Sequence, residues 1–277
     1  MKIMKHGFGL SVKRKSNKQS TNIHKHSVTY LVDTLIEQAD IILEILDARF
    51  IDKTRNYGAE KKVEELGKII IHVLNKADLI DVNLTRENKE LEHLKPYIFF
   101  SCKDRMGTVT LRKMIKIQAK KIDKESVSVG VIGYPNTGKS SIINLLMGRS
   151  VARTSPEAGF TKGIQKVRLA LGLYLIDTPG IIPIGEDSTI SKRDLIKHSE
   201  IGVITWDKVK DPEMIVDRLV KENPGVIEEH YKIKAQEDFE VLIEQIGRKF
   251  NYLKKGNLVD SNRVARQILR DWQEGKI

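Results

Sequence analysis

The sequence predicts an α/β protein: an open, mostly parallel β-sheet with helices on both faces, followed by a small all-α domain. Before Pro183, short and nearly continuous apolar runs alternate with segments of helical periodicity, which is typical of parallel strands covered on both faces. A glycine-rich phosphate-binding pattern lies between one such run and a helical segment. After Pro183 only helical segments follow.

The predicted strands are five apolar runs, at residues 41–46, 68–74, 97–100, 127–132 and 169–176. The predicted helices have apolar residues three or four positions apart; they cover residues 59–66, 85–94, 110–122, 140–147, 211–221, 235–250 and 261–274. We therefore predict a basic N-terminal arm over residues 1–27, an α/β domain over residues 28–188 and a helical domain over residues 189–277.

The composition excludes several classes of protein. Of the 277 residues, 40% are hydrophobic and 31% are charged, which describes a folded protein and not a disordered one. No apolar run approaches the length of a bilayer, and the N-terminus lacks the apolar core of a signal peptide, so we expect a cytoplasmic protein with no membrane partner. The single cysteine, Cys102, cannot form an internal disulfide, and no Cys/His spacing resembles a zinc site.

The formal net charge of +11 is concentrated in two places. Residues 1–30 hold seven Lys or Arg and no acid, and residues 103–124 hold eight basic residues against two acids. Such surfaces suit contact with the phosphates of RNA, whereas a solvated tail, a solvated helix face or a plain amphipathic helix are the alternatives. The helical positions that present these charges are Arg112, Lys113, Lys116 and Lys120, and then Arg263, Arg266 and Arg270.

The strongest motif is G-x-x-x-x-G-K-[ST] at residues 133–140, with a predicted strand before it and a predicted helix after it. Its backbone N–H groups would converge on phosphate oxygens, aided by the helix N-terminus. Lys139 would reach the β- and γ-phosphates, and the Ser140 hydroxyl would hold Mg²⁺. A glycine-rich turn matched by chance is the alternative. The predicted nucleotide contacts of this loop are Gly133, Pro135, Asn136, Thr137, Gly138, Lys139, Ser140 and Ser141.

A second phosphate-side motif, Asp-Thr-Pro-Gly, occupies residues 177–180. Asp177 ends an apolar run, where the acid of a P-loop protein approaches Mg²⁺ through water. Gly180 can present its amide to the γ-phosphate because no side chain is in the way. Alone, such a Pro-Gly sequence indicates only a turn or loop. About forty residues after a phosphate loop, it predicts a γ-phosphate sensor.

A base-recognition motif, Asn75-Lys76-Ala-Asp78, follows the run at residues 68–74. The Asp78 carboxylate can accept two hydrogen bonds from N1–H and N2–H₂ of guanine, an edge that adenine does not offer. The alternative is that Asp78 caps a helix. The tripeptide Ser101-Cys102-Lys103 follows the next apolar run, at residues 97–100. It gives weak support to guanine binding, because a loop there can offer an N–H to the purine oxygen.

The base motif precedes the phosphate loop in this chain, whereas ordinary GTPases present the phosphate loop first and the base motif later. Either the base motif is incidental in an ATPase or kinase, or the P-loop GTPase domain is circularly permuted, with its motifs in the order G4-G5-G1-G2-G3. Permutation is physically tolerable because the site needs the strand ends on one edge of the sheet and no particular chain order.

Together these motifs resemble the circularly permuted GTPases of ribosome assembly, the YlqF/RbgA-like family. The resemblance implies a monomeric, Mg²⁺-dependent GTP hydrolase whose partner is ribosomal RNA or a large-subunit precursor. It also implies that Thr161 coordinates Mg²⁺ and senses the γ-phosphate. The matching segments are Asp47-Ala-Arg49, Asn75 to Asp78, Ser101 to Lys103, residues 133–141, Gly159-Phe-Thr161, residues 177–181 and the closing region from Gly256.

Two details of the resemblance concern mechanism. Ile181 stands where many GTPases place a water-orienting glutamine, so slow intrinsic hydrolysis is expected. Family members with an asparagine at the place of Asn136 are associated with K⁺, which would be held there by Asn136 and phosphate oxygens; the alternative is a plain loop-forming residue. The family's Phe-Pro-Gly-His-Met segment is missing, which leaves His6, His24 and His26 as weak catalytic candidates. An RNA-binding scaffold with an idle nucleotide pocket is a further alternative.

Overall fold

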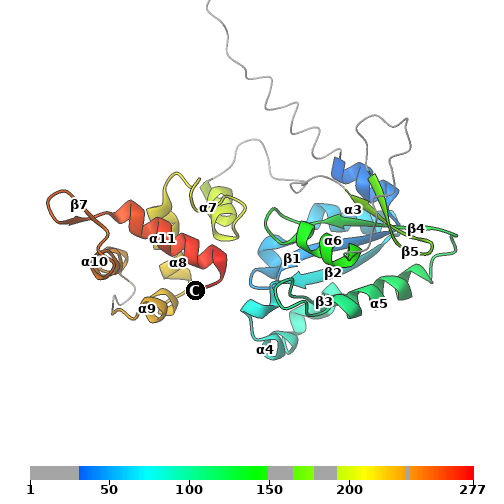
Figure 1. Ribbon diagram of the computed structural model, residues 1–277, viewed down its shortest axis with the longest axis horizontal. Helices are drawn as coiled ribbons and strands as arrows, with labels where there is room; N and C mark the ends of the chain where they lie inside the picture. Colours follow the sequence, from blue (N-terminus) through cyan, green and yellow to red (C-terminus); the bar gives the residue numbers. More distant parts are fainter. Residues whose placement is uncertain (1–30, 149–164, 178–191, 235–237) are drawn as a thin grey trace, which may run out of the picture.

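A computed structural model describes residues 31–148, 165–177, 192–234 and 238–277 of the chain. An α/β unit and a helical unit lie side by side along the long axis (Figure 1). Among the described residues, no helix has both the length and the apolar character needed to cross a membrane.

The α/β unit is built on a six-stranded sheet with the order β3-β2-β1-β4-β6-β5. All neighbouring strands are parallel except β5, which pairs antiparallel with β6. From β1 the chain continues to β2 on one side, and from β4 it continues toward β6 on the other. The carboxyl ends of β1 and β4 therefore form a topological switch point, which we call the crevice because open α/β sheets bind their ligands at such a point. The strands are β1 Ile41–Asp47, β2 Ile69–Asn75, β3 Tyr97–Phe99, β4 Val127–Ile132, β5 Gln165–Ala170 and β6 Leu173–Asp177.

Helices cover both faces of this sheet, which confirms the predicted class. One face packs its apolar side chains against α5 and α6, through residues such as Leu111 and Ile142. The other face packs against the helix at residues 31–38 and against α3, through residues such as Leu35 and Val63. The helical segments of this unit are α2 Ile51–Thr54, α3 Tyr57–Glu65, η1 Ala77–Leu79, α4 Val82–Arg86, η2 Lys89–Leu94, α5 Thr108–Ala119 and α6 Lys139–Met147.

Two predicted elements are wrong in detail. Residues 169–176 were expected to form one strand, but Gly172, with φ of 69°, turns the chain there and produces the β5–β6 hairpin. Residues 85–94 were expected to form one helix, but the Asn88 side chain accepts a hydrogen bond from Glu90 N and starts the separate 3-10 segment η2 after α4 has ended. Local turn chemistry outweighs apolar spacing in both places.

The helical unit packs around α11, whose residues Val264, Ile268 and Leu269 are fully buried. Helix α11 has the predicted bounds, whereas α7, α9 and the two-stranded hairpin of this unit were not predicted. The predicted domain boundaries stay predictions. The elements are α7 Lys192–Glu200, α8 Pro212–Glu222, α9 Val226–Tyr231, α10 Phe239–Lys249, β7 Leu253–Lys254, β8 Leu258–Val259 and α11 Ser261–Glu274.

Candidate nucleotide-binding site

The carboxyl ends of the central strands bring the predicted motifs to one edge of the sheet. Asp47 ends β1 and is the Cα partner of Asn75, which ends β2. The phosphate-loop segment, residues 133–138, follows β4 directly and leads into α6. The base motif and the phosphate-loop motif therefore share one crevice although they are reversed along the chain.

A direct contact joins the two motifs. Asn75 is buried, and its Nδ2 donates a hydrogen bond to the carbonyl oxygen of Thr137 at 2.7 Å. Gly138 adopts φ of 100°, and a Cβ on it would lie 2.1 Å from that same Nδ2. This glycine is thus required both by the backbone conformation and by the approach of the asparagine.

The carboxylate of Asp78 is held by the loop that follows β3. The Ser101 hydroxyl donates to Asp78 Oδ1 at 2.7 Å, and Lys103 Nζ lies 3.9 Å from Asp78 Oδ2. Asp78 lies inside η1, whose N-cap is Lys76, so it does not cap this helical segment. Cys102 of the same loop is half-buried, and burial raises the pKa of its thiol.

The ammonium of Lys139 lies inside the phosphate loop, where its Nζ donates hydrogen bonds to the carbonyls of Gly133, at 2.8 Å, and Tyr134. Burial lowers the pKa of Lys139 to about 8. A phosphate at the loop would favour the charged ammonium again, because an opposite charge nearby offsets desolvation. Ser140 and Ser141, in the first turn of α6, are exposed to solvent.

A charged cluster beside the crevice, which we call the strand-end cluster, consists of Asp47, Arg49 and Lys76. Arg49 donates to both carboxylate oxygens of Asp47, at 3.0 and 2.8 Å, and Lys76 Nζ lies 2.8 Å from Asp47 Oδ2. Burial alone would raise the pKa of Asp47, but the hydrogen bond and charge of Arg49 together with Lys76 outweigh it and lower the pKa. Arg49 also donates to the Trp272 carbonyl at 2.9 Å, which links the crevice to the helical unit.

The helical unit also contacts the phosphate loop. Asn136, with φ of 62°, donates from Nδ2 to the Gly202 carbonyl at 2.6 Å. Lys197 Nζ lies 3.1 Å from the Tyr134 hydroxyl. Sequence reasoning missed these contributions of α7 and of the turn after it, because no local motif marks a contact between residues sixty positions apart. A K⁺-binding role for Asn136 stays a prediction.

Several predicted site residues cannot be placed in this geometry. Thr161, Gly180 and Ile181 lie outside the described residues, as do the basic arm and its three histidines. The backbone of Asp177 ends β6 next to β4, whereas its side chain is outside the description.

Comparison with known proteins adds to this geometry. A family model described as "50S ribosome-binding GTPase" matches residues 128–244. A GTP-binding protein of Methanocaldococcus jannaschii is 39% identical over 257 residues, which is 91% of this chain and 66% of that protein. Nucleolar GTP-binding protein 2 of Saccharomyces cerevisiae is 35% identical over 250 residues, which is 88% of this chain and 50% of that protein. This chain thus spans at most two thirds of these curated relatives.

A solved structure, GNP-bound YlqF from T. maritima, superposes on this chain with a TM-score of 0.65. It is 26% identical, and the match covers 90% of this chain and 94% of that one. The GDP-bound structure of the same protein gives a TM-score of 0.66.

Proposed function

The chain belongs to the circularly permuted GTPases of the YlqF family, and on that premise we propose that it binds GTP in the strand-end crevice and hydrolyses it with Mg²⁺. The contact from Asn75 to the Thr137 carbonyl carries the proposal, because it joins a base-recognition motif to a phosphate loop. One nucleotide can then reach both motifs.

In this proposal Asp78 selects guanine. Its carboxylate is 11% exposed, so its lone pairs find little water, and an adenine edge would leave them unpaired. The Ser101 hydroxyl fixes the carboxylate before the base arrives. A competing ATPase or kinase would show no such preference.

Lys139 and Ser140 hold the phosphates and the metal in this proposal, together with Thr161 and Asp177. The donor set of two hydroxyls and a carboxylate suits Mg²⁺, which prefers hard oxygen ligands. Asp177 follows Ile176, whose Cα partner on β4 is Gly130, three residues before the loop glycine Gly133. Bound Mg²⁺ would neutralise charge on the β- and γ-phosphates. The protein itself supplies the desolvated ammonium of Lys139 and the N-terminus of α6.

Gly180 completes this proposed catalytic group by presenting its amide to the γ-phosphate. With an aliphatic Ile181 after it, hydrolysis is slow unless another group orients the water. Asn136 would hold K⁺ against the phosphates, which requires its side chain to leave the Gly202 carbonyl.

Guanine selection is tested with Asp78→Asn. Xanthine carries a carbonyl oxygen in place of the guanine N2–H₂, so it needs a donor, which the asparagine amide provides. We expect wild-type protein to prefer GDP over ADP and XDP, and Asp78→Asn to bind GDP at least 100-fold more weakly while gaining affinity for XDP. The control is Asp81→Asn, since Asp81 only caps α4. Equal affinity of wild type for GDP and ADP contradicts the proposal and favours the ATPase.

Hydrolysis is tested in single-turnover reactions with GTP and Mg²⁺, in K⁺ and in Na⁺. We expect slow turnover that is faster in K⁺, and loss of the K⁺ effect in Asn136→Ala. Absence of turnover in both salts, with purified ribosomal subunits present, would establish the scaffold with an idle pocket.

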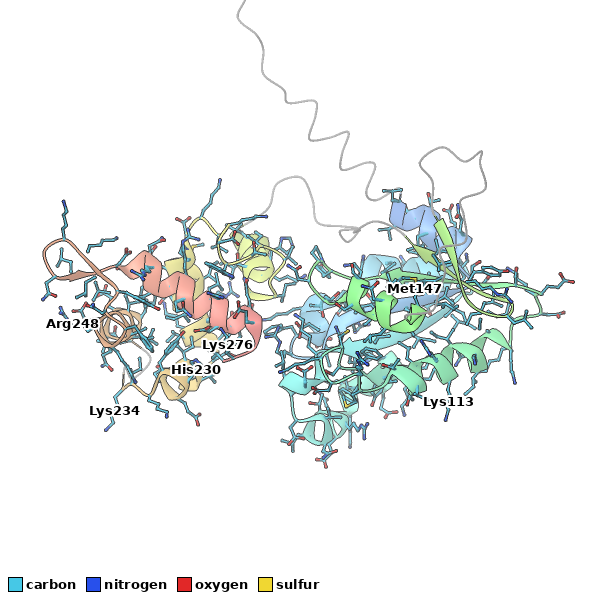
Figure 2. All side chains as sticks on the ribbon, in the orientation of Figure 1. Lys113, Met147, His230, Lys234, Arg248 and Lys276 are labelled. Carbon is cyan, nitrogen blue, oxygen red and sulfur yellow. The ribbon has the colours of Figure 1, made fainter. Side chains whose placement is uncertain are left out.

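Ribosomal RNA of a large-subunit precursor is the proposed partner. Arg112, Lys113, Lys116 and Lys120 are all exposed on or just after α5, and Figure 2 shows Lys113 pointing away from the sheet. On α11, Arg266 donates instead to the carbonyls of Trp206, Asp207 and Val209, so it serves the packing of the helical unit. Its neighbours Arg263 and Arg270 are exposed, and each lies over an aromatic ring.

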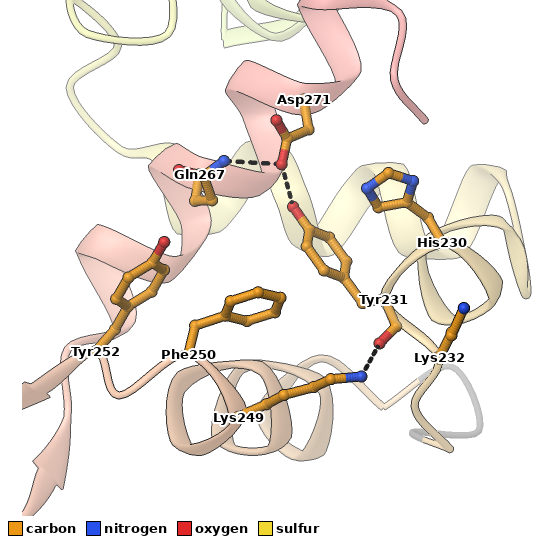
Figure 3. Close-up of a pocket in the computed structure, with 8 residues that line it drawn as sticks. All are labelled: His230, Tyr231, Lys232, Lys249, Phe250, Tyr252, Gln267 and Asp271. Atoms are coloured by element: carbon orange, nitrogen blue, oxygen red, sulfur yellow. Dashed lines mark hydrogen bonds between the residues drawn. The ribbon is translucent and has the colours of Figure 1, made fainter.

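A pocket of about 250 Å³ in the helical unit supports this partner (Figure 3). The rings of Tyr231, Phe250 and Tyr252 line it together with Lys232 and Lys249. Of these rings Phe250 is exposed, and an exposed ring with lysines beside it suits an unpaired base and its phosphate.

RNA contact is tested by removing charge from α5. We expect the triple variant Lys113→Gln/Lys116→Gln/Lys120→Gln to bind rRNA fragments at least 10-fold more weakly and with a shallower salt dependence. The control removes the same charge elsewhere, with Lys61→Gln/Lys89→Gln/Lys95→Gln. Wild-type binding that is unchanged from low to high salt would contradict contact through phosphates.

A further inference from the structure

A second polar group lies in the middle of the same sheet, away from the crevice. Glu44 on β1 and His72 on β2 are Cα partners, and both side chains are almost completely buried, with 0% and 4% exposed. Glu60 of α3 brings a third carboxylate, and donor atoms of the three residues lie within 4.8 Å of one another. We call these three residues the mid-strand cluster.

The mid-strand cluster interrupts an otherwise apolar face. Ile42 and Leu46, the neighbours of Glu44 on the same face of β1, belong to two separate apolar clusters on either side of it. Burying a charged side chain between them is costly unless a counter-charge or a metal accompanies it. Glu60 is the most exposed of the three, with 16% of its side chain accessible to solvent.

Each of the three side chains is oriented by a bond on its outer side. His72 Nδ1 lies 2.7 Å from the Leu94 carbonyl, so Nδ1 carries the proton and the lone pair of the neutral ring is on Nε2. Glu44 Oε1 accepts from Asn56 N at 2.8 Å, and Arg55 binds both oxygens of Glu60, at 2.9 and 2.6 Å. A carboxylate oxygen has two lone pairs, so Glu60 keeps one on each oxygen.

The atoms that face the middle of the cluster differ from these outer atoms. Among the residues that the structure describes, neither Glu44 Oε2 nor His72 Nε2 has a hydrogen-bond partner, and these two atoms face each other at 3.4 Å. Outer bonds that fix the ring and the carboxylates, with inner lone pairs free, are the arrangement that surrounds metal ligands in proteins.

We propose that Glu44, Glu60 and His72 bind one Zn²⁺ ion. One imidazole nitrogen and two carboxylate oxygens are ordinary zinc ligands, and water would supply the fourth position. Mg²⁺ is disfavoured because it avoids nitrogen and retains its own waters, so this site is distinct from the magnesium of the nucleotide site. No local Cys/His spacing in the sequence predicts this site, because its three ligands come from β1, α3 and β2.

The competing explanation is a proton shared between Glu44 Oε2 and His72 Nε2, with Glu60 and Arg55 as the other charged groups that face the pair. That arrangement leaves no place for a metal. Titration of Zn²⁺ into the full chain separates the two explanations.

The test uses full-length protein in which His6, His24 and His26 of the arm are replaced by Gln, so that their imidazoles do not bind metal. After dialysis against a chelator and then buffer containing Mg²⁺, calorimetry with ZnCl₂ should show one ion per chain. Co²⁺ should give the intense visible absorption of a four-coordinate site. His72→Gln and Glu60→Gln should each weaken Zn²⁺ binding at least 10-fold. His93→Gln, an exposed neighbour that touches Arg55, should leave it unchanged.

Circular dichroism and GDP binding show whether each variant is folded, so a misfolded variant is not mistaken for a lost ligand. Because GDP binding is measured separately, loss of the zinc site and failure of the proposed function are distinguishable. Zn²⁺ binding below one ion per chain, or undiminished binding in a folded His72→Gln protein, would overturn the proposal in favour of the shared proton.

Discussion

Strands β1 and β2 carry two buried polar clusters that differ in how their acids are paired. In the strand-end cluster, both oxygens of Asp47 are bound by Arg49, and Lys76 adds a second cation. In the mid-strand cluster, three residues earlier on β1, one oxygen of Glu44 has no hydrogen-bond partner among the described residues. Asp47 and Glu44 are equally buried, with 1% and 0% of their surface exposed to solvent.

The difference shows that partners, and not burial, decide whether a buried acid is ionised. Fixed cations outweigh burial at Asp47 and lower its pKa. At Glu44 burial dominates over the lowering effect of the nearby His72, and the pKa rises to about 7. An acid whose oxygens are bound by cations stays ionised and joins parts of the chain, whereas an acid with an unpartnered oxygen retains affinity for a proton or a metal ion.

The largest expected effect breaks the strand-end cluster. Asp47→Asn leaves Arg49 and Lys76 without their shared counter-charge in a buried place. We expect the free energy of unfolding to fall by about 3–5 kcal/mol, measured by urea denaturation at pH 7. Asp52→Asn, an exposed acid of α2, is the control and should change stability little. A loss below about 1 kcal/mol for Asp47→Asn would show that the cluster is solvated.

The next effect sharpens the contrast between the two acids through pH. Because the folded state raises the pKa of Glu44 from 4.5 to about 7, it holds that proton more tightly than the unfolded chain does. Stability should therefore fall by about 1–3 kcal/mol as the pH rises from 5 to 7.5, in the presence of a chelator. Glu44→Gln should remove this fall, as measured by urea denaturation at both pH values.

The acids with lowered pKa values do not interfere in that window. Asp47 and Glu60 contribute stability above their unfolded pKa values near 4, which is lost only as the pH falls through their lower folded values. A fall between pH 5 and 7.5 that persists unchanged in Glu44→Gln would assign it to another group.

A smaller change tests the geometry of the strand-end cluster while its charge is kept. Arg49→Lys retains a cation for Asp47 but loses the two-pronged contact and the bond to the Trp272 carbonyl. We expect a loss of about 1–2 kcal/mol in urea denaturation. Arg105→Lys, an exposed position, is the matched control. Equal stability of the two variants would mean that charge alone holds the cluster.

The smallest effect tests how far the mid-strand cluster extends outward. His93 lies 2.6 Å from Arg55 through Nε2, but it is exposed to solvent. We expect His93→Gln to change the free energy of unfolding by less than about 0.5 kcal/mol. A larger loss would make His93 part of the cluster.

Much of the fold could be predicted from local signals. Residues 127–132 form a strand and residues 261–274 a helix with the predicted bounds, because a compact apolar run marks the first while the Asp260 cap and Gly275 delimit the second. Residues 169–176 and 85–94 were wrong because single residues, Gly172 and Asn88, divide them.

The crevice could be predicted only as a set of motifs. The base motif and phosphate-loop motif are each local, and the order of strands brings them together. The links from Arg49 to Trp272 and from Asn136 to Gly202 were not predictable, because they depend on how two units pack. The nucleotide-binding roles of the residues stay predictions.

The sequence carries a faint signal of the mid-strand cluster. Glu44 and His72 are polar residues inside apolar runs that were predicted to be buried strands. Each alone is uninformative, and only the β1–β2 register, in which they are Cα partners, shows that they belong together.

The reversed order of motifs also affects how the chain is made. A nascent chain completes β1, β2 and β3 before β4 exists, although β4 is the neighbour that covers one edge of β1. Until residue 132 has left the ribosome, the apolar strand β1 presents an uncovered edge that can pair with another chain. Overproduction of fragments that stop before β4 should therefore yield aggregates, whereas chains that include it should be recovered in the supernatant.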